Sequence, residues 1–346
     1  YLFLNDDAYI SFRYAAHWAE YGEVTYNLGE RVEGYTNFLW VALLAAGHRL
    51  GADIPLLSYV LSLILSLGTL IGSALFATTV EVDEQSKKKR ALVVLALLAV
   101  SPSFACWTSG GLEVQLFTAC FTLGTVLSVQ AWMRPNGSRM QLAWRGGLAG
   151  MVLALAAMTR PEGVMFFGLI GLYRLGWIFV KKSRLTLLEY GCIFSFLLLY
   201  TPYFIWRYHY YGHIFPNTYY AKVGASGFWI PGLKYVGEWF IYHSWLLVGL
   251  GVHGVSCLKA RNEELRTLPT QVEQHIKWVA LLCGGALCIH VARVGGDFMA
   301  LHRFLVPLLP LGAVLCSGLF VRSYSKTKPS LGSDRWRMIL GLFMVV

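Results

Sequence analysis

The feature that most constrains this chain is a series of apolar runs, each of about twenty residues, separated by short polar segments. Such a run crosses a bilayer as a helix, because a helix satisfies its own backbone hydrogen bonds in lipid. Hydrophobic residues make up 56% of the 346 residues and charged residues 14%, and the mean hydropathy is +0.53. These values are typical of a polytopic membrane protein. We therefore predict an all-α fold, a transmembrane helical bundle.

Basic residues in the short loops orient this bundle. A first full span at Leu56–Thr79 precedes the run Lys87–Arg90, which the positive-inside rule places in the cytoplasm. Alternation from that point puts the later basic loops on the same side. The net charge of +10 is thereby explained by topology, and we do not expect nucleic-acid binding. The other predicted spans are Ala91–Trp107, Val114–Trp132, Gly146–Met158, Gly163–Val180, Leu185–Trp206, Val236–Leu258, Lys277–Val294 and Phe304–Val321, with a last one beginning near Met338.

Unusual polar and aromatic motifs fall in the loops on the opposite, outer side. They are NDDAYISFRYA, YNLGERVEGYTN, SGGLE, TRPEG, HYYGHIFPNTYYAK and GGDFMALHR. The inner loops carry only ordinary basic residues and solvated Glu or Ser. Because loops from several helices must contact a substrate together, an active site at the outer membrane surface explains this asymmetry.

The adjacent carboxylates Asp6 and Asp7 begin the first motif. One alternative is a helix cap, in which Asn5 or Asp6 accepts hydrogen bonds from amide groups at the helix start. One cap needs only one residue, and two adjacent like charges repel near a low-dielectric surface. We therefore favour catalysis, in which a carboxylate deprotonates an acceptor hydroxyl or stabilises positive charge at a sugar carbon. Arg13, on the same predicted helix, would form an internal ion pair or bind a phosphate.

Other residues of the outer motifs are candidate substrate contacts. The loop YNLGERVEGYTN forms either a self-contained polar knot or a sugar pocket, and we give these alternatives equal weight. A cap is the better explanation for Glu113 and Glu162, whereas Arg160 needs an anionic partner. The full set of predicted substrate contacts is Tyr9, Arg13, Asn27, Arg31, Glu33, Tyr35, Asn37, Glu113, Arg160, Glu162, Asn217, Tyr220, Lys222, Asp297, His302 and Arg303.

Metal ligands are not predicted. His209 and His213 are four residues apart, but no adjacent carboxylate completes a metal site. No Gly-rich phosphate loop indicates a nucleotide cofactor. A requirement for a divalent metal stays open.

We expect residues 1–346 to form one transmembrane domain. Residues 1–55 would be an outer catalytic loop that includes Phe38–Leu50, a helix too short to span the membrane and therefore placed in its interface. Residues 56–346 would supply about nine complete spans and one truncated span. Because the chain begins at Tyr1 and stops at Val346 within an apolar run, we expect it to lack an N-terminal helix and its C-terminal end.

The order of the motifs carries a family resemblance. DDAYISFRYA, YNLGERVEGYTNFLW, SGGLE, TRPEG, YYGHIFPNTYYAK and GGDFMALHRFLVPLLP, from Asp6 to Pro310, are similar to the C-type polytopic glycosyltransferases, and particularly to the terminal arabinofuranosyltransferases. The resemblance implies a helical membrane enzyme that uses a polyprenyl-phosphate sugar as donor. It also implies an acidic motif in the first extracytoplasmic loop, which maps onto Asp6 and Asp7.

These observations together predict a glycosyltransferase of a bacterial inner (plasma) membrane, with its active site facing the periplasm or the cell exterior. It would transfer a sugar, with arabinofuranose as the lead, from a polyprenyl-phosphate donor to a glycan or glycolipid acceptor of the cell envelope. Two alternatives are a transporter or flippase of lipid-linked sugars and a non-catalytic membrane protein of envelope assembly. The transporter would need polar residues near the middle of several spans, which the sequence mostly lacks.

Overall fold

The computed structural model describes residues 3–81, 83–134, 136–217, 220, 228–249, 251 and 268–326. Within these ranges every regular element is a helix, which confirms the predicted all-α class. The elements are α1 (Asp6–Tyr21), α2 (Phe38–Arg49), α3 (Ile54–Thr79), α4 (Glu84–Ala99), α5 (Pro102–Cys106), α6 (Val114–Met133), α7 (Arg139–Thr159), α8 (Glu162–Val180), α9 (Leu187–Tyr211), α11 (Trp229–Tyr242), α13 (Leu268–Arg293), the 3₁₀ helix η2 (Arg303–Leu308) and α14 (Leu309–Lys326).

Six of these helices are long and apolar enough to cross a membrane, namely α3, α6, α7, α8, α9 and α13 from Gln271. Each matches a predicted span, and several extend into neighbouring polar residues. For example, α7 begins at Arg139 rather than Gly146, because Ser138 accepts a hydrogen bond from the Gln141 amide at 3.3 Å in a capping box. The protein is therefore an integral membrane protein with a helical bundle.

Three predicted spans differ from the structure. One of them, Phe304–Val321, is divided into the 3₁₀ helix η2, which contains Pro307, and α14, and it is not among the six helices that are long and apolar enough to cross a membrane. The run Ala91–Trp107 is not one helix, because α4 ends at Ala99 and Ser101 caps the short α5 that follows, with Pro102 in its first turn. In place of a helix beginning at Val236, α11 occupies Trp229–Tyr242. The end of that predicted span and the span near Met338 lie outside the described residues.

Arg90 lies in the core of the bundle, which corrects its assignment to an exposed basic loop. Its side chain is fully buried and pairs with Glu81 and Glu273, each at 2.7 Å. Arg174 likewise pairs with Glu189 at 2.8 Å. These glutamates are not solvated as predicted, because each partly buried or buried carboxylate neutralises an arginine that apolar helices surround.

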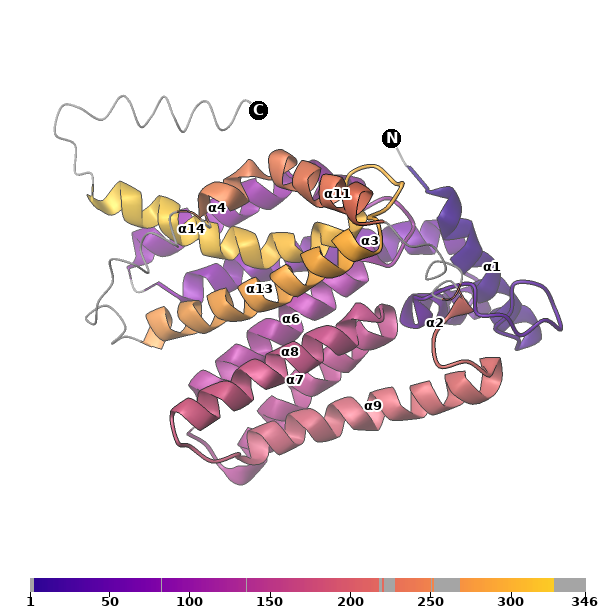
Figure 1. Ribbon diagram of the computed structural model, residues 1–346, viewed down its shortest axis with the longest axis horizontal. Coiled ribbons are helices and arrows are strands. Elements are labelled where there is room, and N and C mark those ends of the chain that lie inside the picture. The colour runs from indigo at the N-terminus through magenta and orange to yellow at the C-terminus, as the bar shows by residue number, and fades with distance from the viewer. Residues whose placement is uncertain are drawn as a thin grey trace.

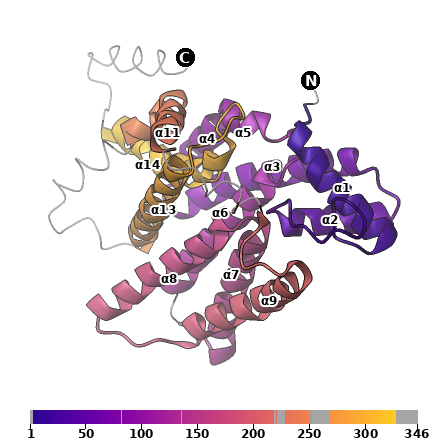
Figure 2. The ribbon, with the colours of Figure 1, turned by 45° about the vertical axis from the view of Figure 1, so that its right-hand side comes forward.

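Close packing joins α7 to α9, and the two helices lie side by side in both ribbon views (Figures 1 and 2). A Cβ atom at Gly146 would lie 1.9 Å from the Leu188 carbonyl oxygen, and one at Gly150 would lie 2.0 Å from the Cys192 oxygen. Only glycine allows this approach. Small residues spaced four apart are a common means of helix association in membranes, where apolar surface alone gives no preference for protein over lipid.

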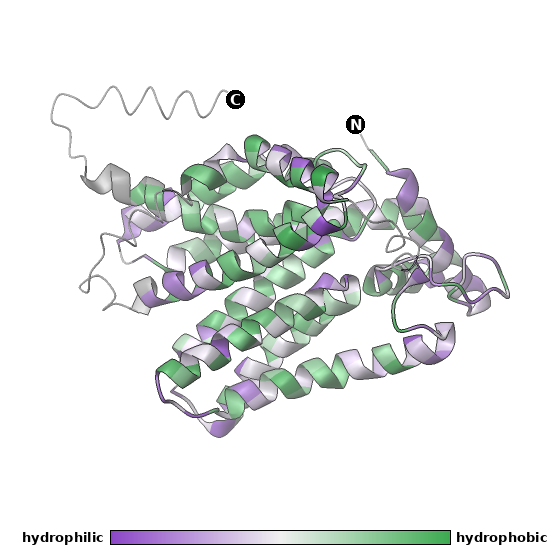
Figure 3. Ribbon diagram, in the orientation of Figure 1, coloured by the Kyte–Doolittle hydropathy of each residue, from purple (hydrophilic) through white to green (hydrophobic). Residues whose placement is uncertain are grey.

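One end of the bundle carries α1 and α2, and we call it the α1 end (Figure 1). The chain direction of the helices brings the motifs SGGLE, TRPEG and GGDFMALHR to this end. Hydrophilic residues gather at the helix ends and on α1 in Figure 3, while apolar residues dominate the middles. Lys87–Lys89, which lie in the first turns of α4 and not in the predicted loop, and the loop with Lys181–Lys182 are at the opposite end. Which end faces the outside stays a prediction from the positive-inside rule.

Candidate functional site

The start of α1 exposes the two adjacent aspartates. Asn5 is the cap of this helix, and its side-chain oxygen accepts a hydrogen bond from the Asp7 amide at 2.9 Å. The cap alternative therefore does not account for both carboxylates, although Asp6 Oδ1 also lies 3.1 Å from the Asp7 amide. Asp6 is exposed, and Asp7 is half-buried with its Oδ2 atom 3.8 Å from Nη2 of Arg303.

Arg303 connects Asp7 to a second carboxylate, Asp297. The Arg303 guanidinium contacts Asp297 through Nε and faces Asp7 through Nη2. The side chains of Asp297, Arg303 and Asp7 are 4%, 12% and 36% exposed, so accessibility increases from Asp297 to Asp7. We call these three residues the Arg303 cluster. It places one accessible carboxylate beside a cation that a buried carboxylate holds in position.

The loop before Arg303 has an unusual backbone. Gly295 and Gly296 have positive φ angles of 88° and 77°, and the non-glycine residues Leu301 and His302 have φ angles of 60° and 53°. The Leu301 carbonyl accepts a hydrogen bond from Nε1 of Trp107 at 3.2 Å, which fixes the loop against the turn after α5. Left-handed non-glycine residues cost free energy and are concentrated at functional sites.

A second polar network joins four of the motifs predicted to meet. Asn37 donates hydrogen bonds to Ser11 Oγ at 3.0 Å and to Glu113 at 2.8 Å. Glu113 pairs with Arg160 at 3.0 Å, and Arg160 also pairs with Glu162 at 3.0 Å. We call these five residues the Arg160 network. It confirms that Arg160 has an anionic partner. Glu113 is the N-cap residue of α6 and Glu162 lies in the first turn of α8, but no side-chain cap hydrogen bond is formed at either helix start, and both carboxylates pair with Arg160.

Phe304 brings the Arg160 network and the Arg303 cluster together. Its ring centroid lies 4.7 Å from the guanidinium carbon of Arg160 and 5.1 Å from that of Arg303. Burial acts to lower the pKa of Arg160, but the charges of Glu162, Glu113 and Asp297 outweigh it and raise that pKa. Arg160 therefore stays cationic, and the aromatic face between the two guanidinium groups offsets part of their repulsion.

Glu33 and Tyr35 lie in a separate buried cluster. Glu33 makes a bidentate ion pair with Arg207 of α9, with both N–O distances at 2.7 Å. The Tyr35 hydroxyl accepts a hydrogen bond from Tyr211 at 3.2 Å, and Asn217 donates its backbone amide to the Glu33 carbonyl at 3.2 Å. We call Glu33, Tyr35, Arg207 and Tyr211 the Glu33 anchor. The loop is therefore not the self-contained polar knot of the first alternative, because Glu33 and Tyr35 bond to side chains of α9.

Several other predicted contacts do not meet the Arg303 cluster in the described structure. Arg13 is exposed and donates to the Tyr26 carbonyl at 2.7 Å, so its phosphate role has no structural support. Asn27 bonds to Glu30 at 3.0 Å, and Arg31 stacks on a tyrosine ring. The remaining members of this group are Tyr9 and Tyr220, which are exposed, and Lys222, which lies outside the described residues.

Sequence reasoning missed Ser11, Trp107, Arg207 and Phe304. Ser11 and Phe304 resemble ordinary residues of an amphipathic or apolar helix, and Trp107 looks like one more interfacial aromatic residue. Arg207 gave a usable signal, because a charge at the end of an apolar run needs a partner. No pattern in the sequence named that partner, which is 174 residues away.

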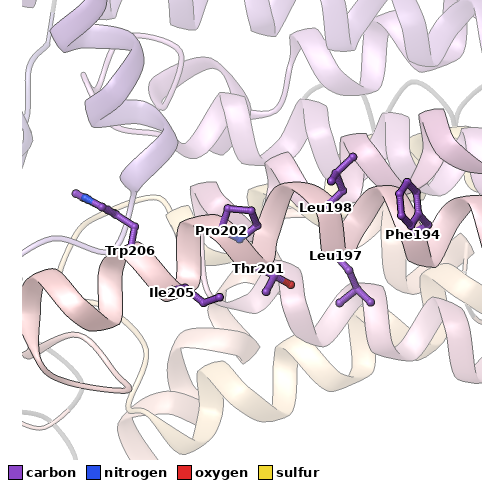
Figure 4. Close-up of a pocket in the computed structure, with 7 residues that line it drawn as sticks. All are labelled: Phe194, Leu197, Leu198, Thr201, Pro202, Ile205 and Trp206. Carbon is purple, nitrogen blue, oxygen red and sulfur yellow. The ribbon is translucent and has the colours of Figure 1, made fainter.

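Among the described residues, no group of three or more His, Cys, Asp or Glu side chains could hold a metal ion. An apolar groove of about 610 Å³ lies along α9 and is shown in Figure 4. Its lining is Phe194, Leu197, Leu198, Thr201, Pro202, Ile205 and Trp206. The groove has no charged side chain, so it is suited to hydrocarbon and not to the chemistry of a sugar phosphate.

Comparisons with known proteins agree with the motifs. The chain is 27% identical over 332 residues to a terminal beta-(1->2)-arabinofuranosyltransferase of Mycobacterium tuberculosis, covering 89% of this chain and 52% of the relative. It is 26% identical over 337 residues to the protein of the same name from Corynebacterium glutamicum, covering 89% of this chain and 47% of that relative. The chain thus spans about half the length of these curated relatives.

No family model matches the chain. No solved structure matches it either. The two relatives nevertheless match along most of the chain, and the fold is helical and membrane-spanning. This integral membrane protein is a distant homologue of the terminal β-(1→2)-arabinofuranosyltransferases, as its motifs indicated.

Proposed function

We propose that the protein is a membrane glycosyltransferase that transfers a sugar from a polyprenyl-phosphate donor to a glycan or glycolipid acceptor. Arabinofuranose is the first sugar to test, because both relatives are named for its transfer. The observation that carries the proposal is the Arg303 cluster, in which the accessible carboxylate of Asp7 lies beside the guanidinium of Arg303. An acid–base group next to a fixed cation is what transfer from a sugar phosphate requires.

Asp7 is the residue that we place at the reacting atoms. Its carboxylate takes the proton of an acceptor hydroxyl while that oxygen forms a bond to the anomeric carbon of the donor sugar. The bond between this carbon and the phosphate oxygen breaks, and its electron pair leaves with the phosphate. Arg303 offsets the charge that develops on that phosphate, and Asp297 holds the guanidinium in place.

The surroundings of the Arg303 cluster support the same function. Arg160 supplies a second buried cation on the other side of Phe304, while the Arg160 network ties α1 to the ends of α6, α7 and α8. A polyprenyl tail needs apolar protein surface within the membrane, and α9 offers such surface along its groove. The basic residues at the opposite end, in the first turns of α4 and in the loop after α8, support a site that faces the periplasm or cell exterior.

Purified protein in lipid nanodiscs tests the proposal directly. The assay supplies a radiolabelled polyprenyl-phosphate arabinofuranose and an arabinan oligosaccharide, and it measures the labelled, lengthened oligosaccharide. We expect product from the wild type and a loss of product in Asp7→Asn. A parallel assay in sealed vesicles measures movement of the donor across the bilayer. Donor movement without any product would contradict the proposal and would favour the flippase alternative.

A further inference from the structure

Helix α11 presents three different faces at the α1 end. Its core face packs tightly on α13, because a Cβ atom at Gly232 would lie 2.0 Å from the Ala292 carbonyl oxygen. A second face exposes apolar side chains, as expected for contact with lipid. Between these two faces lies a polar flank formed by Lys234, Glu238 and Tyr242, which follow one another at intervals of about one helical turn.

His302 of the strained loop faces this flank. Its ring centroid lies 4.7 Å from that of Tyr235 and 5.6 Å from that of Tyr242. Its Nε2 atom lies 3.7 Å from Oε2 of Glu238. This separation is too long for a direct hydrogen bond, and a hydroxyl group or a water molecule that contacts both atoms would satisfy them.

The imidazole of His302 has unused hydrogen-bonding capacity. The residue is 95% buried, and its Nδ1 atom has no hydrogen-bond partner among the described residues. Burial lowers the pKa of His302, although Glu238 acts in the opposite direction. The ring is therefore neutral near pH 7 and can both donate and accept a hydrogen bond. Its left-handed backbone, with φ at 53°, holds it in this position.

Glu238 distinguishes this flank from the region around Arg303, where we place the phosphate of the donor. The Glu238 side chain is 46% exposed, so a ligand can reach it, and its Oε1 atom lies 3.8 Å from Nζ of Lys234, which is 77% exposed. A carboxylate repels a phosphate but accepts hydrogen bonds from neutral hydroxyl groups, and tyrosine rings pack against sugar faces. The cation that attracts phosphate is Arg303, the next residue after His302. The α-carbons of neighbouring residues are about 3.8 Å apart, so the two sides adjoin.

We propose that Glu238, Tyr242 and His302 form the acceptor subsite, which binds a neutral sugar of the glycan acceptor; this inference rests on the proposed transferase function. The carboxylate and the imidazole bind hydroxyl groups of that sugar, and Tyr242 contacts its ring. Because His302 adjoins Arg303, the bound acceptor extends toward Asp7, which removes the proton of its attacking hydroxyl. Glu238 and Tyr242 are binding residues in this account, and neither takes part in the chemical step.

Matched substitutions test the subsite in nanodiscs with the radiolabelled donor and an arabinan oligosaccharide. We expect Glu238→Gln and Tyr242→Ala each to raise the acceptor KM roughly tenfold, with the donor KM and the rate of donor hydrolysis in the absence of acceptor unchanged. Tyr242→Phe keeps the ring and should stay close to wild type. The controls are Glu20→Gln and Tyr21→Ala, whose side chains are similarly exposed on α1.

The outcomes separate this inference from the transferase function. If the wild type transfers sugar and the Glu238 and Tyr242 variants behave like the α1 controls, the subsite assignment is wrong and the transferase function stands. A raised donor KM in Glu238→Gln would also overturn the assignment, because it would place the donor at this flank. If the wild type transfers no sugar to any acceptor, the transferase function itself fails. Saturation-transfer NMR of the oligosaccharide with the Glu238→Gln variant should show weaker acceptor binding than with Glu20→Gln.

Discussion

The Arg303 cluster and the Glu33 anchor each pair an arginine with a carboxylate, but they differ in how exposed that carboxylate is and in the length of the ion pair. In the anchor, Glu33 is 2% exposed and both of its oxygens bond to Arg207 at 2.7 Å. In the Arg303 cluster, Asp7 is 36% exposed and lies 3.8 Å from Arg303. Saturated, buried ion pairs hold elements together, whereas an accessible carboxylate beside a cation can exchange its contact for a substrate.

The two clusters also connect different parts of the chain. The Glu33 anchor joins the loop after α1 to the end of α9, while the Arg303 cluster joins the start of α1 to the loop after α13. We therefore assign chemistry to the Arg303 cluster and support of the loop to the anchor. Substitutions in the two clusters should separate activity from stability.

Among substitutions at residues other than Asp7, we expect Arg303→Lys to have the largest effect on activity. Arg303→Lys keeps the charge and the pairing with Asp297, but it loses the planar fork that can serve two anions at once. We expect kcat for sugar transfer to fall about 10²–10³-fold, because one donor to the developing phosphate charge is lost. Steady-state kinetics in nanodiscs measures this, with Lys181→Arg as a surface control. Activity within threefold of wild type would show that Arg303 does not contact the phosphate.

The next effect is expected in stability, at the Glu33 anchor. Glu33→Gln leaves the buried Arg207 without its charged partner, which should lower the free energy of unfolding by about 3–5 kcal/mol. Thermal unfolding in nanodiscs measures the loss. Activity per folded molecule should fall less than tenfold. A fall as large as that of Asp7→Asn at unchanged stability would move Glu33 from the anchor to the reacting centre.

An intermediate effect is expected at Asn37, which connects α1 to the Arg160 network. Asn37→Ala removes its hydrogen bonds to Ser11 and Glu113 and leaves a buried carboxylate with one fewer donor. We expect a loss of about 1–3 kcal/mol in stability and a roughly tenfold lower transfer rate, because the start of α1 becomes less well positioned. Calorimetry and the transfer assay check both values. An unchanged rate would show that the network does not position Asp7.

The smallest effect is expected at Arg13. Its exposed guanidinium donates a hydrogen bond to the Tyr26 carbonyl, and its central carbon lies 4.6 Å from the centroid of the Tyr26 ring. Arg13→Ala should change stability by less than about 1 kcal/mol and transfer by less than twofold. Donor titrations check this. A tenfold rise in the donor KM would show that Arg13 contacts the donor phosphate. Substrate binding would then extend beyond the Arg303 cluster.

Much of the fold could be predicted from the sequence because membrane insertion depends on local composition. A stretch such as Leu56–Thr79 has to be helical in lipid whatever its neighbours are. The break between α4 and α5 was missed because Ser101 and Pro102 lie inside an apolar run, where the hydropathy signal outweighs a capping signal. Arg90 was misplaced for the related reason that a basic run predicts a loop, whereas Lys87–Arg90 lies within α4 and Arg90 pairs inside the bundle.

The candidate site could be proposed from the sequence, but its side-chain contacts could not be predicted. Asp6 and Asp7 were identified because two adjacent carboxylates are unusual near a membrane. The positions of Glu113 and Glu162 at helix starts were predicted, but the pairing of Glu113 with Arg160 was missed because the two residues are 47 apart along the chain. The role of Glu33 was undecided for the same reason, since its partner Arg207 is 174 residues away along the chain.

The most direct test of this account compares Asp7→Asn with Asp6→Asn in the transfer assay, at equal amounts of folded protein. Asp7 faces Arg303, whereas Asp6 is exposed and lies outside the Arg303 cluster. The account predicts that Asp7→Asn lowers kcat about 10³-fold or more and that Asp6→Asn has a clearly smaller effect. Transfer by Asp7→Asn at a rate close to that of the wild type would contradict the assignment of chemistry to the Arg303 cluster.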